Sequence, residues 1–330
     1  MSTEGPMGFK GRLAAKAGAG ELDFSTGTRY YYEFLREEIT SRNQVEVSQG
    51  ITGDRSQRSE RDRAGPYTHG GWLHMHLSPG DVGQWLYWAT GGTVTGVGTS
   101  GNPFTYPLAS GLPSFSVYVD KVTPYDAGST ATFELRNAQI DTLVIHGLRR
   151  EQEGEGPPEP DFVQLSVRMF GLTTTTGTKT FPAAWALGST ELYRPYEMSD
   201  LALNILSEAR EVKEFKFVLA NNLFQRRVNS LNPTALYPDG FRQVLLQVRV
   251  PNDTDHADLY DRYPDYGAGT LTIGRQPAAT LYQTAIAMPA LRAPRNGPVI
   301  LNKSEIDLTL QFACRRVGTG DECTITNQVA

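Results

Sequence analysis

The sequence lacks the patterns that usually indicate membrane insertion, metal binding or catalysis. It has two cysteines and five histidines in 330 residues, with no metal-type cysteine pair. No apolar run approaches the roughly 18 residues of a membrane helix, and no N-terminal stretch resembles the core of a signal peptide. The serine-hydrolase, phosphate-loop and dinucleotide-binding motifs are also missing. We therefore expect a protein that stays in a cytosol-like compartment, is not an enzyme, and uses no metal, cofactor or membrane.

Charge is nearly balanced, with one concentrated exception. The chain carries 31 Lys plus Arg against 36 Asp plus Glu, a formal net charge of -5, whereas a nucleic-acid-binding domain usually has a clear positive excess. Residues 53–65 read GDRSQRSERDRAG, and their charged members are Asp54, Arg55, Arg58, Glu60, Arg61, Asp62 and Arg63. Four arginines could grip phosphates. Because three acids are interspersed among them, a nucleic-acid-binding interpretation is disfavoured.

The few histidines and cysteines read most simply as structural residues. His74 and His76 share one face of a strand near His69, a spacing compatible with a metal pair, but no cysteine or carboxylate lies beside them at ligand-like spacing. Cys314 lies in a strand pattern and Cys323 follows a turn. Free thiols are the expectation, and a bridge across a hairpin is the alternative.

Alternating hydrophobic and polar residues predict strands with one buried face. The clearest strands are predicted in 72–77, 161–171, 244–250 and 305–316. Their expected core-facing residues are Leu73, Met75 and Leu77; Val163, Leu165, Val167 and Met169; Val244, Leu246, Val248 and Val250; and Ile306, Leu308, Leu310, Phe312 and Cys314. Because one face of each strand is polar, we expect antiparallel sheets and a mainly β fold.

Two short helices are predicted, each directly after a strand. Residues 78–90 open with Ser78, Pro79 and Asp81 as start signals and place Val82, Trp85, Leu86 and Ala89 at helical spacing. Residues 252–263 follow the same plan, with Asn252 or Asp253 as the cap. The alternating acids there lack the ligand and glycine positions of a calcium loop, so a capped helix start explains them.

The order of these elements occurs twice along the chain, which predicts two similar β-sandwich or barrel modules in tandem. Each module would contain one short helix and long inter-strand loops. The stretches 38–50, 72–77, 113–120, 131–148 and 161–171 correspond in order to 209–223, 242–250, 268–275, 279–291 and 304–316. We assign 1–180 to the first module, with an N-terminal arm and a charged loop at 50–70, and 186–330 to the second. The boundary is placed in the Thr- and Gly-rich stretch 171–189.

Several short stretches, in order, are similar to the major tail tube proteins of long-tailed (siphovirus-type) bacteriophages. They are Gly53, Asp54 and Arg55; Gly70, Gly71 and Trp72; Phe115 and Tyr118 in PSFSVYVDK; and Asn221, Asn222 and Leu223. The similarity covers the chain from about residue 30 onward. None of these residues is a chemical necessity, so the resemblance rests on their order.

This resemblance implies a structural virion protein that polymerises into a tail tube, assembled in the host cytoplasm. Its implied partners are further copies of itself, the tape measure protein, and the tail terminator and distal tail proteins. Viral DNA would pass through the tube without being bound. With two modules per chain, three copies suffice for a ring of six similar walls, and stacked rings give an open filament.

The polar loop of each module is the predicted contact with a neighbouring subunit or ring. In the first module this is the charged run Asp54, Arg55, Arg58, Glu60, Arg61, Asp62 and Arg63. In the second it contains Asn221, Asn222, Arg226 and Arg227. We expect assembly through the charged run to weaken as salt rises.

Two alternatives remain open from the sequence. A carbohydrate-binding or hydrolytic β-protein of a phage would use exposed aromatics such as Trp72, Trp85, Trp88 or Tyr263 as a sugar platform, although Trp85 is the most core-like of them. A distal-tail or baseplate protein would share the fold of a tube protein and show the same pattern.

Overall fold

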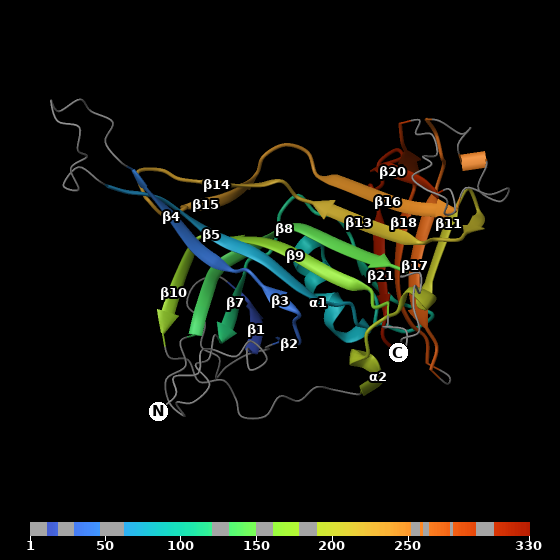
Figure 1. Ribbon diagram of the computed structural model, residues 1–330, viewed down its shortest axis with the longest axis horizontal. Coiled ribbons are helices and arrows are strands. Elements are labelled where there is room, and N and C mark those ends of the chain that lie inside the picture. Colours follow the sequence, from blue (N-terminus) through green and yellow to red (C-terminus); the bar gives the residue numbers. More distant parts are fainter. Residues whose placement is uncertain are drawn as a thin grey trace.

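Strands dominate the chain, as the alternating patterns predict (Figure 1). The computed structural model describes residues 12–18, 30–46, 63–120, 132–149, 161–177, 190–251, 258–259, 264–277, 280–294 and 307–330. The strands of the first half are β1 (Arg12–Ala17), β2 (Tyr30–Tyr32), β3 (Arg36–Glu37), β4 (Thr40–Glu46), β5 (Arg63–His76), β6 (Phe104–Tyr106), β7 (Phe115–Asp120), β8 (Thr132–Leu148), β9 (Gln164–Gly171) and β10 (Thr173–Gly177).

The second half adds the remaining strands. They are β11 (Leu201–Ile205), β12 (Glu208–Arg210), β13 (Glu214–Ala220), β14 (Leu223–Arg226), β15 (Ala235–Pro238), β16 (Gln243–Pro251), β17 (Gly269–Arg275), β18 (Tyr282–Met288), β19 (Ala290–Arg292), β20 (Asp307–Arg315) and β21 (Thr324–Gln328). The helices are α1 (Pro79–Thr90), α2 (Thr190–Tyr193) and the 3-10 helix η3 (Met198–Asp200). The prediction of a mainly β fold is confirmed.

Strand pairing in the two halves runs in the same order. In the first half β4 pairs with β5, β5 with β9, and β9 with β8; β8 also pairs with β7 and β10, and β7 with β1, which pairs with β2. In the second half β13 pairs with β16, β16 with β20, and β20 with β19, while β18 pairs with β17 and β21, and β17 with β11, which pairs with β12. The long strand β8 therefore corresponds to both β18 and β19 of the second half.

A single sheet nevertheless runs through both halves. The C-terminal part of β8 pairs antiparallel with β13 over seven residue pairs, from Thr142↔Ala220 to Leu148↔Glu214. In Figure 1 the long strands β5, β9, β8, β13 and β16 cross the molecule side by side, while β1, β2, β7 and β10 lie at one end and β11, β17, β18 and β21 at the other. This continuous sheet, β4-β5-β9-β8-β13-β16-β20-β19, is called the long sheet below.

The core lies between the long sheet and the shorter groups of strands, with α1 inside it. Ser78 caps α1, because its Oγ accepts a hydrogen bond from the Asp81 N–H at 3.3 Å, and Gly91 ends it in the left-handed region (φ 77°). Trp85 and Trp88 are fully buried, and Trp88 stacks on Phe115 with ring centroids 4.3 Å apart. Helix α1 contacts β8 of the long sheet. It also contacts β6, β18 and β21 of a second, six-stranded sheet with the order β12-β11-β17-β18-β21-β6.

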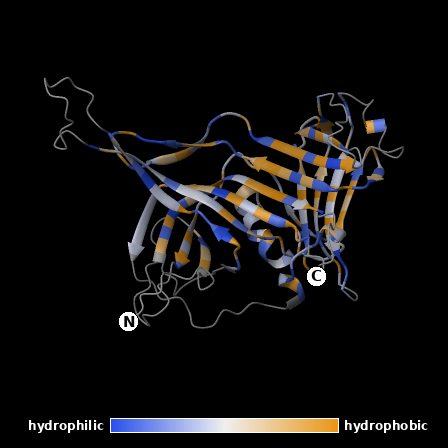
Figure 2. Cartoon of the chain, viewed as in Figure 1, coloured by the Kyte–Doolittle hydropathy of each residue, from blue (hydrophilic) through white to orange (hydrophobic). Residues whose placement is uncertain are grey.

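The predicted core faces of the strands are confirmed wherever the structure describes them. All the alternating positions of 72–77, 161–171, 244–250 and 305–316 are buried except Ile306, which lies outside the described residues. Figure 2 shows this alternation as hydrophobic and hydrophilic bands along the long strands. The predicted residues Val82, Trp85, Leu86 and Ala89 of α1 are also buried.

Three expectations need correction. Residues 63–70, predicted as part of a charged loop, form the beginning of β5 and pair with β4, because edge strands tolerate charged residues. The threonines at 173–176, predicted as linker, form β10 on β8, as suits β-branched residues. Helix α2 was not predicted. Of the helix predicted at 252–263, only Asp258 and Leu259 are described, and both are helical.

Candidate assembly surfaces

Two hairpins of different halves lie against each other at one end of the long sheet. The first-half hairpin comprises β4 and β5, and the second-half hairpin comprises β14 and β15, which lie between β13 and β16 (Figure 1). The Tyr67 N–H donates to the Leu231 carbonyl at 2.8 Å, and Arg227 Nη2 donates to the Tyr67 carbonyl at 2.5 Å. His69 Nε2 lies 3.1 Å from Asn232 Oδ1. The second-half hairpin therefore contacts residues 67–69 of the first.

The base of the second-half hairpin is fixed by buried polar groups. The Asn221 side-chain amide donates to the carbonyls of Ala89 and Ile140, each at 3.0 Å, and its Oδ1 accepts from Arg242 Nε at 2.9 Å. The Leu223 N–H donates to Asp141 Oδ1 at 2.7 Å. Asn221 is 4% exposed, so it acts inside the chain, and the contact surface proposed below omits it.

The other predicted residues of this loop are at or near the surface. Asn222 adopts the left-handed conformation (φ 52°), and its side-chain amide donates to the Phe241 carbonyl at 2.6 Å. Arg226 is exposed, with its guanidinium 5.7 Å from the Tyr237 ring centroid. The stretch predicted as a polar loop is thus a two-stranded hairpin. Its exposed aromatic residues were missed, because only four residues on each side are paired and Pro233 interrupts the pattern.

Of the charged residues in the run, only Arg63 lies within the described part of the chain. Asp54, Arg55, Arg58, Glu60, Arg61 and Asp62 lie outside the described residues. Arg63 is exposed at the start of β5, where it pairs with Glu46 at the end of β4. The contact role of this run stays a prediction.

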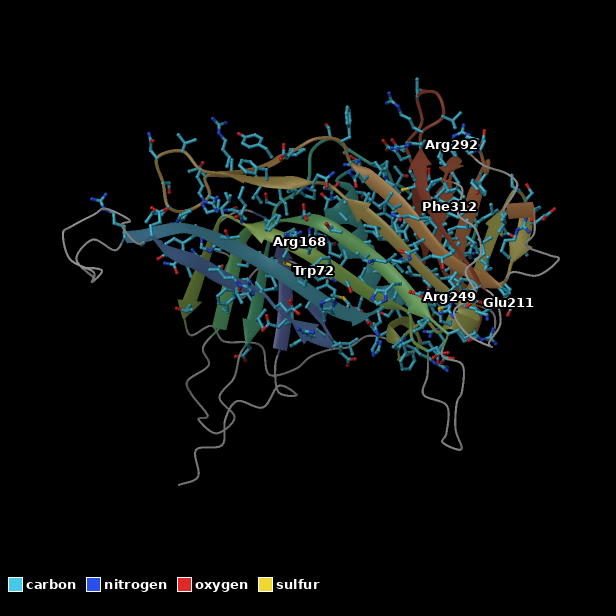
Figure 3. The ribbon with its side chains drawn as sticks, turned by 45° about the horizontal axis from the view of Figure 1, so that its top comes forward. Trp72, Arg168, Glu211, Arg249, Arg292 and Phe312 are labelled. Carbon is cyan, nitrogen blue, oxygen red and sulfur yellow. The ribbon has the colours of Figure 1, made fainter. Side chains whose placement is uncertain are left out.

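The face of the long sheet that points away from the core is polar and open. Cross-strand neighbours Trp72 and Arg168 lie next to each other on it, and Arg249 lies further along the same sheet (Figure 3). The exposed residues of this face on the second-half strands are Lys216, Gln243, Gln247, Arg292, Thr309, Gln311 and Arg315. A shallow pocket of about 590 Å³ opens on the face and is lined in part by Trp72, His74, His146 and Lys216.

Charges on and beside this face are largely paired. Asp307 contacts Arg249 Nη2 at 2.5 Å and Lys213 Nζ at 2.9 Å. Burial, the largest single influence, would raise the pKa of Asp307, but the hydrogen bonds and charges of the two cations together hold that pKa below its usual value. Arg168 Nη1 lies 3.6 Å from Asp141 Oδ2. The face therefore carries both paired charges and the exposed cations Lys216 and Arg315.

The histidines of this face form a hydrogen-bonded group, not a metal site. His74 Nδ1 lies 2.8 Å from Ser166 Oγ, which lies 3.5 Å from His146 Nε2. Burial lowers the pKa of both histidines, so they are neutral near pH 7. Across the part of the chain that the structure describes, no group of three or more His, Cys, Asp or Glu could hold a metal ion. Both cysteines are buried and free.

The proposed sugar platform is not assembled. Trp85 and Trp88 are fully buried in the core, so the expectation that Trp88 could be exposed is wrong; the helix turns both rings toward Tyr32 and Phe115. Tyr263 lies outside the described residues. Trp72 alone remains on the surface, half-buried, and stacks on His74 with ring centroids 6.0 Å apart. Among the described helices, none has the length and apolar character needed to cross a membrane.

Comparison with known proteins assigns the chain to a family. The sequence profile of the phage tail tube protein family matches residues 8–314, which is nearly the whole chain. A search of curated proteins found no match. The chain therefore belongs to the phage tail tube protein family, as the order of its short motifs predicted, and is a structural component of a phage tail.

Proposed function

We propose that three copies of this tail tube protein close into a ring with six similar walls, and that stacked rings form the channel through which viral DNA leaves the virion. The observation that supports this most is the repeated order of strand pairing. Pairs β4-β5-β9-β8 and β13-β16-β20-β19 follow one another in a single sheet, so each chain contributes two equivalent lengths of wall. The same proposal divides the chain into a first module, 1–180, and a second module, 186–330.

The long sheet supplies edges through which such a ring could close. Within the described residues, β4 pairs only with β5 and β3 only with β5, while β20 pairs only with β16 over Asp307–Phe312. Unpaired strand edges readily add another strand. Every neighbouring pair along the sheet is antiparallel, so the open stretch of β20, the seventh strand, runs in the same direction as β4, the first strand.

The β8–β13 junction provides the pattern for this closure. There the last strand of the first wall unit and the first strand of the second make a seven-residue antiparallel ladder within one chain. We propose that the open edge at the end of the second wall unit pairs with β4 of the next copy through a strand ladder of its own. A head-to-tail joint that closes after a fixed number of copies is a heterologous ring contact, and stacking of rings then needs no further closure.

We assign the polar face of the long sheet to the channel lining. A closed barrel with many strands leaves an aqueous lumen, and the core face is already occupied by α1 and the shorter strands. DNA would pass most freely along a wall whose cations are paired with carboxylates, as Arg249 is with Asp307, because unpaired cations would hold phosphates. Tape measure, terminator and distal tail proteins would be the partners of the assembled tube, and assembly would take place in the host cytoplasm.

Negative-stain electron microscopy of the concentrated purified protein tests this function. We expect rings, or tubes of uniform width with a central hole. Discrete particles without a hole at every concentration would contradict tube formation. A single capping ring that never stacks would instead indicate a distal-tail protein of the same fold.

A further inference from the structure

Exposed apolar side chains are concentrated on the second-half hairpin and the residues that follow it. Nine large hydrophobic residues are exposed among those the structure describes, and five of them lie between 224 and 241: Phe224, Val228, Leu231, Tyr237 and Phe241. Phe241 is 92% exposed, the highest value of the nine. Phe224 and Tyr237 are cross-strand partners. A group of exposed apolar side chains gathered in one region of a surface is typical of an interaction site.

The first half of the chain shows what contacts the matching position. Leu73 of β5 and Leu246 of β16 are both buried and face the inward residues Val167 and Phe312 of the next strand. Counting back five residues from each leucine makes Thr68 of β5 the counterpart of Phe241, which lies just before β16. Thr68 is itself exposed, but the second-half hairpin contacts it and its neighbour, since Arg227 Nη2 reaches Thr68 Oγ1 at 3.2 Å and the Tyr67 carbonyl at 2.5 Å.

The arginines of the second-half hairpin can be matched to first-half positions in the same way. Thr40 pairs with Gly70 where β4 meets β5, and Ala220 pairs with Gln243 where β13 meets β16. Arg226 and Arg227 follow Ala220 by six and seven residues, and Glu46 follows Thr40 by six. The exposed Glu46, at the end of β4, therefore corresponds to Arg226, which lies next to the Arg227 that contacts Thr68.

We infer that Phe241 is a contact site for a second copy of this chain, and that the first-half hairpin of that copy, around Glu46, contacts it. This contact deepens the proposed ring and rests on it, because it is the inter-chain equivalent of the hairpin contact already present within the chain. The two kinds of junction differ in chemistry. The contacted residue is a polar threonine inside the chain and an aromatic ring between chains, where an aromatic side chain is the typical anchor of an interface.

A matched pair of surface variants tests the contact. Phe241→Ser removes the ring, and Val317→Ser, at a residue 61% exposed in the turn between β20 and β21, is the control. Both variants should keep the wild-type thermal midpoint, because neither side chain is part of the core. By sedimentation velocity over a concentration series, we expect Phe241→Ser to raise the concentration for half-assembly at least about tenfold, and Val317→Ser to leave it unchanged.

Cross-linking tests the identity of the occupant. One chain carries Glu46→Cys and a second carries Phe241→Cys, so a short bismaleimide linking the two gives a covalent dimer in the mixture and none in either chain alone. If the wild type forms rings, Phe241→Ser forms them equally well and the cysteine mixture gives no dimer, the Phe241 contact is contradicted while the proposed ring is not. A wild-type chain that stays monomeric at every concentration, and forms no dimer in the cysteine mixture, contradicts the ring and this contact with it.

Discussion

The first-half and second-half hairpins lie side by side but present different chemistry. The outward residues of β4 and of the start of β5 are polar or small, such as Arg42, Asn43 and Thr68, whereas the second-half hairpin exposes Phe224 and Tyr237. Both hairpins join equivalent strands of the same sheet. One frame of strand pairing therefore carries two contact surfaces. A ring of three such chains would alternate them, which a ring of six identical single modules cannot do.

The interiors of the two halves differ as well, and the largest expected effect tests whether they unfold together. Trp88→Ala removes a buried ring from the aromatic group around α1 and should cost about 3 to 5 kcal/mol of the free energy of unfolding. Because the β8–β13 ladder joins the halves, we expect one cooperative transition in calorimetry, shifted to lower temperature as a whole. Two separate transitions, of which only one moves, would show that the halves are independent domains.

The base of the second-half hairpin is expected to depend on one of its two adjacent asparagines. Asn221→Ala leaves the buried carbonyls of Ala89 and Ile140 without their donor and should lower the free energy of unfolding by about 2 to 3 kcal/mol. Asn222→Gly is the control, since glycine accepts a φ of 52° and the lost hydrogen bond is exposed, so its cost should stay below about 0.5 kcal/mol. Denaturant unfolding measures both. Equal losses would mean that Asn221 does not anchor the hairpin.

A pH dependence is expected from the first half, at the start of α1. Burial raises the pKa of Asp81 to about 6 in the folded chain, above its ordinary value of 3.8. Because the pKa of Asp81 is higher in the folded chain than in the unfolded one, its protonation stabilises the fold. This contribution is fully present below the unfolded pKa and is lost as pH rises through about 6. Relative to Asp81→Asn, the wild type should therefore gain roughly 2 kcal/mol between pH 7.5 and pH 4. Parallel stability curves for the two proteins across that range would disprove the assignment.

The charged run offers the smallest effect per residue, and it sharpens the contrast between the hairpins. Replacing Arg55, Arg58, Arg61 and Arg63 with serine should leave the monomer folded but weaken polymerisation, because each exposed pair contributes about 0 to 1 kcal/mol and only several together matter. Wild-type assembly through this run should also weaken with added salt. The apolar contact at Phe241 should be insensitive to salt. Light scattering across a salt series separates the two, and tubes that form normally from the serine variant would remove the run from the assembly surface.

Local patterns were enough to predict the elements that have one buried face. The alternating residues of β16 and β20 and the helical spacing of α1 gave the right strands, helix and core side chains, because burial follows directly from period. The beginning of β5 and the strand β10 were missed, since charged residues at an edge and a run of threonines read equally well as loop. The hairpin β14–β15 was missed for another reason. Its strands are short, and the buried Gln225 hydrogen-bonds to His69 of β5 and Gly171 of β9, which lie far away in the sequence.

The assembly surface could be predicted less fully than the fold. The sequence placed contact residues between equivalent strands of the two halves, but it did not separate Asn221, whose hydrogen bonds are internal, from the exposed Phe241. That distinction depends on the register between β13, β14 and β16, which single-sequence patterns do not encode. Contacts between chains depend on a partner surface as well, and no local pattern of one chain contains it.

The number of chains in one ring tests the central claim most directly. Native mass spectrometry of isolated rings, or of tubes broken down to single rings, gives that number as a multiple of the 36.3 kDa chain. Two equivalent wall units per chain predict three chains in a ring whose averaged images still show sixfold features. A ring of six chains would contradict the account, because each chain would then supply one wall.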